Sequence, residues 1–483
     1  MGFSGVQRVI GFLIAGSSLM MLPPVLVSWW YHDGTANLFL ISSAILLLVG
    51  VITYLPVRNA RHELRLRDGF IVVVSSWLAL VLVGALPFLL LVSPQVSYVD
   101  AVFESMSGLT TTGATILTDI DHLPHAVLYY RQQLQWLGGM GIIVLAVAIL
   151  PILRIGGMQL YRAETPGPLK DSKLTPRITE TAKALWMIYV GITVACGLAY
   201  WLGGMSLFDA TGHAFSTVAI GGFSTHDASI GYWDSTTIET IAMTFMVIAG
   251  INFALHFTAW RRATMQAYFM DPELKVYTFL LFAFSLLVSF ELFISGTYDN
   301  LSAAFRYGTF QVISVMTTTG FTTAKFYEWP GFVPTFLIFI AFIGGCAGST
   351  AGGMKVIRII LLYRQSVREI HRLIHPKAVI PVKVGGHMTS DTVMDAVWGF
   401  FFLYIASFAV MTILLAATGV DAVTAYSSVG ACITNLGPAL GHAGPNYADL
   451  NSTAKVILSI AMLLGRLEIY TLLVLLTPAF WRD

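Results

Sequence analysis

Long apolar segments alternate with short polar segments along the whole chain. Each apolar segment has about the 20 residues that a helix needs to cross the hydrocarbon core of a bilayer. The pattern therefore predicts an all-α polytopic membrane protein with ten transmembrane helices. These helices are expected at residues 8–30, 36–57, 69–94, 126–153, 184–203, 236–260, 276–296, 332–362, 393–418 and 453–479.

Four shorter and less apolar segments interrupt this series, and each leads into a loop that contains a glycine. We expect each segment to enter the membrane as a short helix and to turn back through its loop. The segments cover residues 98–115, 208–224, 302–323 and 422–438. The glycines of their loops are Gly113, Gly222, Gly320 and Gly437.

This recurrence divides the chain into a two-helix hairpin and four units of span, short helix, loop and span. A pattern that returns at near-regular spacing indicates copies of one structural unit, which are expected here to surround a single pore. The hairpin is predicted at residues 1–68. The four units are predicted at 69–160, 161–265, 266–375 and 376–483, the third of them with an intramembrane gating loop.

The distribution of charge predicts the orientation. Charged residues make up 11% of the chain, against roughly 25% in a soluble domain. The linkers between units hold 20 Lys or Arg, whereas the loops around the short helices hold two, Arg306 and Lys325. Short loops rich in Lys and Arg stay cytoplasmic. All four short helices should therefore enter from the outside, and both termini should be cytoplasmic.

The loops are candidates for a selectivity filter. Backbone at membrane depth must be hydrogen-bonded or line water, and carbonyl oxygens can replace the water shell of a cation. Glycine permits the positive φ that turns successive carbonyls toward an axis. The residues before the glycines carry no charge, which favours a monovalent over a divalent cation. They are Thr111, Thr112, Ile220, Gly221, Thr318, Thr319, Asn435 and Leu436. The alternative, that each loop is only a turn between helices, suits one copy better than four.

The short helices carry matching residues at both ends. Asp100, Asp209 and Asp421 are predicted N-caps, which would aim the partly negative C-terminus of each helix at its loop and favour a cation there. Ser107, Ser216 and Ser314 each precede the loop glycine by six residues. We expect these serines to hold the loops by hydrogen bonds.

The second span of the third unit contains a run of small residues that should break the helix, because each glycine disfavours it by about 1 kcal/mol relative to alanine. We interpret this run as a gate beneath the filter. The alternative is close helix packing through small residues. The gate residues are Gly344, Gly345, Gly348, Ser349, Thr350, Gly352 and Gly353.

Arg466 lies inside the last span, where an ionisable side chain is costly and usually functional. We expect it to face the pore and repel a resting cation. The alternative is an ion pair, with Glu468 or another acid, that only holds helices together. Arg131 is expected to snorkel at an outer helix end.

The remaining polar residues show no enzymatic pattern. The histidines lack ligand spacing and are interpreted as satisfied polar residues, and the cysteines predict neither a disulfide framework nor a metal site. The residues concerned are His213, His226, His256, His442, Cys196, Cys346 and Cys432.

Together these strings resemble the TrkH family, the membrane subunits of bacterial Trk potassium uptake systems in the Trk/Ktr/HKT superfamily. The resemblance covers essentially the whole chain. The N-terminal hairpin, Gly344–Gly353 and Gly465–Glu468 favour TrkH over the shorter KtrB. Gln132–Gly141 and Arg162–Pro168 also look like TrkH.

The resemblance implies potassium uptake across the bacterial inner membrane by a homodimer with one pore in each protomer. It implies K⁺ as the transported ion, with Rb⁺ and weaker Na⁺ as substitutes, no organic cofactor and no nucleic-acid partner. It further implies a cytosolic ring of TrkA, whose nucleotide-binding domains control the gate.

Carried over residue by residue, the resemblance places potassium ligands beside the loop glycines, the intramembrane loop at Gly344–Gly353 and the pore arginine at Arg466. The second and fourth loops depart from the pattern, so K⁺/Na⁺ selectivity does not follow from it. The implied filter residues are Thr111, Thr112, Gly113, Ile220, Gly221, Gly222, Thr318, Thr319, Gly320, Asn435, Leu436 and Gly437.

Two other functions stay open. A K⁺/H⁺ or K⁺/Na⁺ symporter with obligatory coupling would need inverted repeats and a midplane site, whereas the charge pattern gives the four units one orientation. A membrane enzyme or receptor would need a cluster of catalytic or ligand-binding groups, and the sequence shows none.

Overall fold

The computed structural model describes residues 3–59, 66–144, 178–378 and 380–482. The predicted end of the span at 126–153 and the basic linker with Arg162–Pro168 lie largely outside these ranges. The chain is helical, as predicted, and one two-stranded antiparallel hairpin joins β1 (Lys383–Val384) to β2 (His387–Met388).

The first half of the chain forms the N-terminal hairpin and the elements of the first two predicted units. These elements are α1 (Phe3–Ser17), η1 (Ser18–Met21), α2 (Leu22–Tyr31), α3 (Ala36–Tyr54), η2 (Leu55–Val57), α4 (Leu66–Gly84), α5 (Leu86–Leu89), α6 (Tyr98–Leu109), η3 (Ile120–His122), α7 (His125–Val144), α10 (Ile178–Leu202), α11 (Leu207–Val218), η6 (Ser229–Trp233), α12 (Thr236–Ala249), α13 (Phe253–Arg262) and α14 (Gln266–Met270).

The second half contains the elements of the third and fourth predicted units. They are α15 (Pro272–Ile294), α16 (Leu301–Met316), η7 (Phe326–Glu328), α17 (Val333–Ala341), α18 (Val356–Ile374), α19 (Asp391–Ala416), α20 (Ala422–Ile433), η8 (Gly441–Ala443), α21 (Ser452–Arg466), α22 (Tyr470–Leu473), η9 (Val474–Leu476) and α23 (Pro478–Trp481).

Six single helical segments among the described residues are long and apolar enough to cross a membrane. Up to eight spans result if each of two bent helix pairs is counted as one. The number of ten spans and the division into four units stay predictions. The six segments are Ser4–Tyr31, Ala36–Val57, Asp68–Leu89, Lys183–Leu202, Pro272–Ile294 and Asp391–Ala416.

The expectation of continuous spans at 236–260 and 453–479 is wrong. The axis bends by 92° between α12 and α13 and by 110° between α21 and the segment Tyr470–Leu476. At the first bend the side chain of Asn252 caps α13 by accepting a hydrogen bond from Ala254 N (2.8 Å). At the second, Glu468 and Ile469 adopt positive φ, which ends α21 although apolar residues resume directly afterwards.

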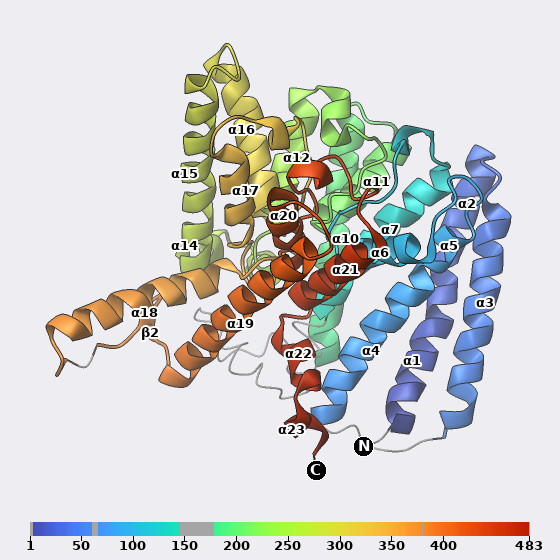
Figure 1. The fold of residues 1–483 in the computed structure, drawn as a ribbon, viewed down its shortest axis with the longest axis horizontal. Coiled ribbons are helices and arrows are strands. Elements are labelled where there is room, and N and C mark those ends of the chain that lie inside the picture. The colour runs from blue at the N-terminus through green and yellow to red at the C-terminus, as the bar shows by residue number, and fades with distance from the viewer. Residues whose placement is uncertain (1–2, 60–65, 145–177, 379, 483) are drawn as a thin grey trace.

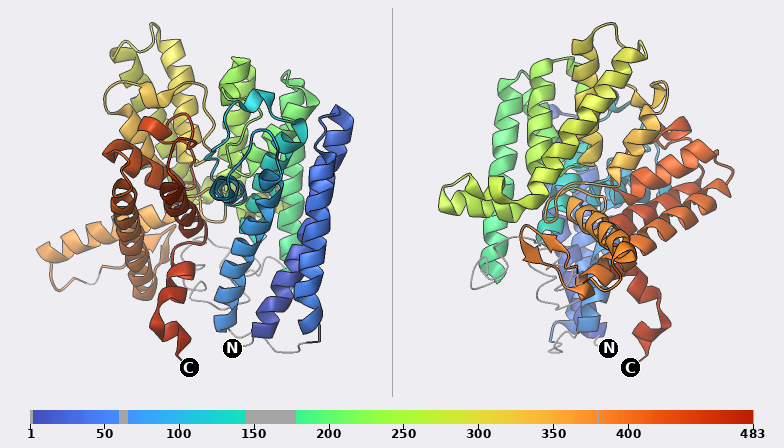
Figure 2. Two further views of the ribbon diagram at one scale, coloured as in Figure 1. Left: turned by 45° about the vertical axis from the view of Figure 1, so that its right-hand side comes forward. Right: turned by 90° about the vertical axis from the view of Figure 1, so that its left-hand side faces the viewer.

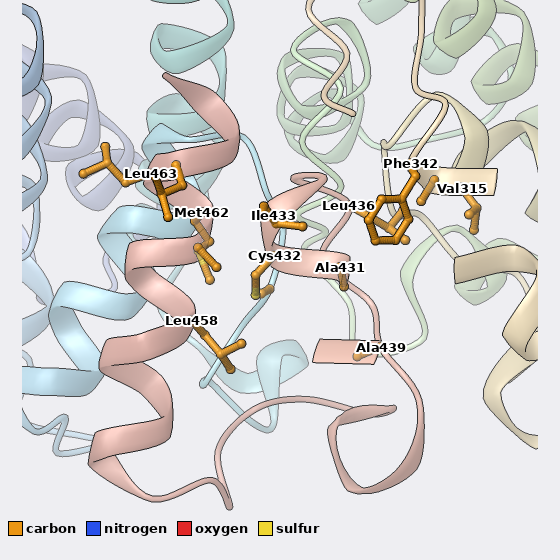
Figure 3. Close-up of a cluster of buried hydrophobic side chains, with 14 of the residues drawn as sticks. Val315, Phe342, Ala431, Cys432, Ile433, Leu436, Ala439, Leu458, Met462 and Leu463 are labelled. Carbon is orange, nitrogen blue, oxygen red and sulfur yellow. The ribbon is translucent and has the colours of Figure 1, made fainter. Parts of the chain in front are cut away.

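The helices form one body from which α18 projects (Figures 1 and 2). The hairpin of α1, η1, α2 and α3 lies at one edge beside α4, and the starts of α1 and α4 lie at the same end of the molecule as α23. The short helices α6, α11, α16 and α20 lie within the body. Figure 3 shows the last turn of α20, with Ala431, Cys432 and Ile433, between Leu458, Met462 and Leu463 on one side and Phe342 with Val315 on the other. The residues that precede the glycine in each of the four following loops are buried as well.

Candidate functional site: a ring of four loops above an intramembrane loop

The four short helices begin with side-chain caps, but the predicted caps hold for only one of three. Asp421 accepts from Thr424 N (3.0 Å) and caps α20 as expected. For α6 and α11 the prediction is wrong, because Ser97 and Ser206 are the N-caps. Asp100 and Asp209 lie three residues later, and each accepts a hydrogen bond from its capping serine (2.7 Å). The carboxylates still lie in the first turn, where the positive end of the helix dipole favours them.

All four short helices end in the same way. In the first, Thr111 N donates to Gly108 O (3.0 Å) and Thr112 N donates to Ser107 O (2.8 Å). This pair of bonds is a Schellman motif, and it requires a left-handed residue where the helix stops. That residue is not glycine in any of the four loops: its φ is 50° at Thr111, 55° at Ile220, 64° at Thr318 and 56° at Asn435.

The predicted serines act mainly through their backbone. The carbonyls of Ser107, Ser216 and Ser314 accept the closing hydrogen bond of the motif, and Ala431 O does the same in the fourth loop (2.7 Å to Leu436 N). A side-chain bond to a loop exists only for Ser314, whose hydroxyl donates to Phe321 O (2.6 Å). The motif depends on backbone geometry, so alanine serves as well as serine.

The four loop glycines contact one another's loops in ring order. A Cβ added to Gly113 would overlap the carbonyl oxygen of Gly221, and one added to Gly222 would overlap that of Thr319. A Cβ on Gly320 would overlap Leu436 O, and one on Gly437 would lie 2.5 Å from Thr112 O, which closes the ring. All four glycines have φ between 80° and 96°. We call Thr110–Gly113, Ala219–Gly222, Thr317–Gly320 and Thr434–Gly437 the loop ring.

The second loop is tied to the neighbouring helix α7 by two hydrogen bonds to one side chain. Gln135 Nε2 donates to Gly221 O (2.6 Å), and Phe223 N donates to Gln135 Oε1 (3.0 Å). Gln132 Nε2 adds a bond to Phe223 O (3.3 Å). The predicted ligand carbonyl of Gly221 therefore already accepts one hydrogen bond from protein. These glutamines enter the sequence-based prediction only within Gln132–Gly141, as part of the resemblance to a family. Three amide side chains in an apolar helix nevertheless indicate buried polar contacts.

Arg131 does not snorkel, as was predicted, but lies buried behind the loop ring. Its Nε donates to the equally buried Glu104 (2.8 Å) on α6, and its Nη1 donates to Ser224 O (3.2 Å). Glu104 also accepts from Ile116 N (3.0 Å). A buried guanidinium needs a carboxylate partner, and Glu104 supplies it from the short helix. This ion pair joins the chain after the first loop to the chain after the second.

His213 and His256 are buried and partnered, as predicted, whereas His442 is exposed and its Nε2 lies 3.9 Å from Asp421 Oδ1. His213 bonds Asp209 O (2.8 Å) and Ser224 Oγ (2.9 Å), and His256 bonds Tyr268 Oη (2.8 Å) and Ile248 O (2.9 Å).

His226 lies outside the spans, in the chain after the second loop. It stacks on Tyr232 and pairs with Asp121 through Nδ1, and its Nε2 lies 3.7 Å from Asp209 Oδ1. Burial opposes protonation, but the hydrogen bonds and negative charges of Asp209 and Asp121 outweigh it and raise the pKa of His226 above 6.5.

The predicted gate segment, Gly344–Gly353, is non-helical and lies directly against the loop ring. Gly352 N donates to Thr318 Oγ1 (2.7 Å), Gly353 N to Thr434 O (3.0 Å) and Thr350 Oγ1 to Val218 O (3.0 Å). A Cβ on Gly352 would overlap Thr434 O, which explains why this position is glycine. The alternative of two helices packed through small residues is wrong for this segment, because the chain has left the helix.

Arg466 completes the layer beneath the ring. It is buried, and its Nε donates to Thr110 O (2.7 Å) while its Nη1 donates to Thr350 O (3.3 Å). Its Nη2 also contacts Thr111 Oγ1. Glu468, the acid named in the ion-pair alternative, pairs with Arg358 instead (2.7 Å). The guanidinium therefore bridges the first loop and the intramembrane loop.

Comparison with known proteins gives the family. A model of the cation transport protein family TrkH matches residues 36–482. The chain is 56% identical to the Trk system potassium uptake protein TrkH of Halomonas elongata, over 99% of both chains. The chain belongs to the TrkH family.

Other TrkH-family proteins match over their full length. The Escherichia coli TrkH protein is 51% identical over 100% of both chains. The crystal structure of the potassium transporter TrkH from Vibrio parahaemolyticus is 50% identical, covers 100% of both chains and superposes with a TM-score of 0.93. The resemblance inferred from the loop strings is thus confirmed at the level of the family.

Proposed function

We propose that this chain takes up potassium ions across the bacterial inner membrane through a channel-like pore. Its relatives carry the name of potassium uptake proteins, which is a transport function and not an enzymatic one. The observation that carries the proposal is the loop ring, in which each glycine meets a carbonyl of the next loop. Such a ring brings uncharged backbone oxygens from four loops together. These oxygens can replace the water shell that a monovalent cation loses when it enters a pore.

The filter in this proposal consists of the loop-ring carbonyls. Glycine gives the chain room at each junction, and the Schellman motif presents the partly negative helix end to the ion. The second loop offers Ile220 and Gly221, whose carbonyl is shared with Gln135, and so differs from the first and third. This unevenness supports preference for K⁺ and Rb⁺ with weaker exclusion of Na⁺. The proposed ligands are Thr111, Thr112, Gly113, Ile220, Gly221, Gly222, Thr318, Thr319, Gly320, Asn435, Leu436 and Gly437.

The gate is the intramembrane loop together with Arg466. The loop bonds the third and fourth filter loops and the last residue of α11, and Arg466 bonds the first filter loop. The buried guanidinium of Arg466 repels a cation that leaves the filter, and it donates a hydrogen bond to the carbonyl of Thr110. An open pore then requires the loop and the arginine to withdraw together, since Arg466 also holds Thr350 O.

The assembly is proposed to be a homodimer with one pore in each protomer, both termini in the cytoplasm and four units of two spans each behind the hairpin. A cytosolic nucleotide-binding ring of the TrkA kind would act on the basic linkers. The helix α18 supports this because it follows the intramembrane loop directly in the chain, and residues 261–275 support it because Glu273 accepts a hydrogen bond from Ala347 N of that loop.

Flux of radioactive rubidium into liposomes that hold the purified protein tests the proposal. Passive uptake that K⁺ blocks better than Na⁺, without a proton gradient, is the expected result. Uptake that begins only when a proton or sodium gradient is imposed would establish the symporter instead. If the protein alone is silent in both settings, addition of the nucleotide-bound ring protein must start the flux for the proposal to hold.

A further inference from the structure

Glu273 is a buried acid that neither the filter nor the gate residues include. It is the second residue of α15, directly after the capping residue Asp271 and Pro272, and it is 2% exposed. It thus lies where the linker from α13 through α14 turns into α15. A carboxylate in such a place is costly unless it accepts strong hydrogen bonds.

One carboxylate oxygen of Glu273 holds the intramembrane loop at two points. Oε1 accepts from Ala347 N (2.8 Å), within the loop, and from Ile357 N (3.0 Å), in the first turn of α18. Ile357 N is one of the helix-start amides that no residue of α18 can bond, and the helix dipole favours a negative charge beside it. The carboxylate therefore spans the glycine-rich part of the loop.

One residue between these two points is held in an unfavourable conformation. Lys355 has φ 77° with ψ 137°, whereas Gly348 and Gly353 adopt φ of 73° and 71° at little cost because they carry no Cβ. A side-chain-bearing residue in that region is strained and persists only where its surroundings impose it. Loss of the two Glu273 bonds would leave this segment free to relax away from the loop ring.

We propose that Glu273 is a latch that holds the intramembrane loop against the loop ring, and that movement of the linker 263–271 opens it. The second part rests on the proposed function of the loop as the gate. Because Glu273 is the second residue of α15, which begins directly after that linker, a push on the linker displaces the carboxylate first. His256, bonded to Tyr268 (2.8 Å), carries the same movement to α13.

Native cysteines provide the test. Cys346 is the residue before Ala347, and Cys346, Cys196 and Cys432 are all free and buried. A membrane-permeant maleimide is applied to the full-length protein, and peptide mass spectrometry follows each thiol. In Glu273→Ala we expect labelling of Cys346 to accelerate about tenfold or more, because each lost bond joined a charged group to a backbone amide. Cys196 and Cys432 should label as in the wild type, which separates a released latch from general unfolding.

Flux in liposomes gives the second readout. Glu273→Ala should raise passive rubidium uptake without changing the relative competition by K⁺ and Na⁺, since the loop ring is untouched. Glu291→Gln, an acid toward the other end of α15, is the matched control and should change neither readout.

Unchanged protection of Cys346, or equal acceleration at all three thiols, overturns the latch. If Glu273→Ala does not fold, the same labelling is measured in Glu273→Gln. The amide keeps an oxygen acceptor but loses the charge, so the labelling of Cys346 should accelerate less than in Glu273→Ala. Selective labelling of Cys346 without increased flux would confirm the latch and reject the loop as the gate.

Discussion

The loop ring and the layer beneath it are built on opposite plans. In the ring, four loops repeat one backbone conformation, with φ of 50° to 64° where the helix ends and 80° to 96° at the glycine. Beneath it, each break differs: a capped bend at Gly250–Asn252, a glycine-rich loop at Gly344–Gly353 and a strained turn at Leu467–Ile469.

The difference indicates which part tolerates variation. In the proposed function, coordination of an ion needs equivalent oxygens from all sides, which accounts for one loop geometry despite different side chains. The proposed gate needs only one obstacle, for which a single loop and a single arginine suffice. The two regions meet in a few hydrogen bonds, among them Gly352 N to Thr318 Oγ1.

The largest effect is expected from breaking the ring. Gly113→Ala should reduce rubidium uptake to background, because its Cβ overlaps Gly221 O and an alanine at φ 82° costs about 1–3 kcal/mol more. Gly34→Ala is the matched control, with φ 78° and open space around it. Loss of uptake in both variants, measured at equal protein in the membrane, would assign the effect to backbone strain and not to the ring.

Removal of the buried ion pair between Arg131 and Glu104, which lies behind the loop ring, is expected to lower the stability of the folded protein. Glu104→Gln leaves the Arg131 guanidinium buried without its carboxylate, which should cost about 3–5 kcal/mol. The midpoint of thermal unfolding in detergent measures this, and Glu104→Gln with Arg131→Gln should recover part of it. Strictly additive losses in the double variant would contradict coupling between the two residues.

A change confined to the lower layer should spare selectivity. Arg466→Gln removes the positive charge and the guanidinium that donates hydrogen bonds to both Thr110 O and Thr350 O. We expect about a tenfold rise in passive flux. The order of competition by K⁺, Rb⁺ and Na⁺ should stay as in the wild type. A changed order would mean that Arg466 shapes the filter itself, and the contrast between the two regions would fail.

The smallest effect is expected at the outer rim. The pKa of His226 is raised above 6.5 in the folded protein, so its pairing with Asp121 and Asp209 stabilises fully below pH 6.5 and is lost as pH rises through the folded pKa. The stability advantage of the wild type over His226→Gln should therefore be larger at pH 5.5 than at pH 8. A pH-independent difference in unfolding midpoint would assign it to stacking on Tyr232 alone.

Local sequence signals predicted the positions of the short helices and of the loops that follow them, because these parts are local. The turn glycines, the short helices and the loop at Gly344–Gly353 each follow from residues that are adjacent in the chain. The start of α6 also carries a local signal, since Ser97 precedes Asp100 in a capping pattern, although the prediction places the cap at the aspartate.

The breaks within the expected spans 236–260 and 453–479 were not predicted, because apolar residues continue on both sides of Gly250–Asn252 and Leu467–Ile469. Their causes are a side-chain cap and two positive-φ residues that composition does not reveal. The pairing of Arg131 with Glu104, and the bonds from Gln135 to the second loop, depend on which helices become neighbours. Only the folded arrangement supplies that information.

The covalent continuity of the ring has a consequence for how its ion preference can change. In a pore made from four identical subunits, every substitution enters four times and alters all sides at once. Here Gly113, Gly222, Gly320 and Gly437 belong to one polypeptide, and each neighbour relation involves a different pair of loops. In the proposed filter, a mutation therefore modifies one quarter of the ring while three quarters are unchanged, so selectivity could be adjusted in single steps that a symmetric pore cannot take.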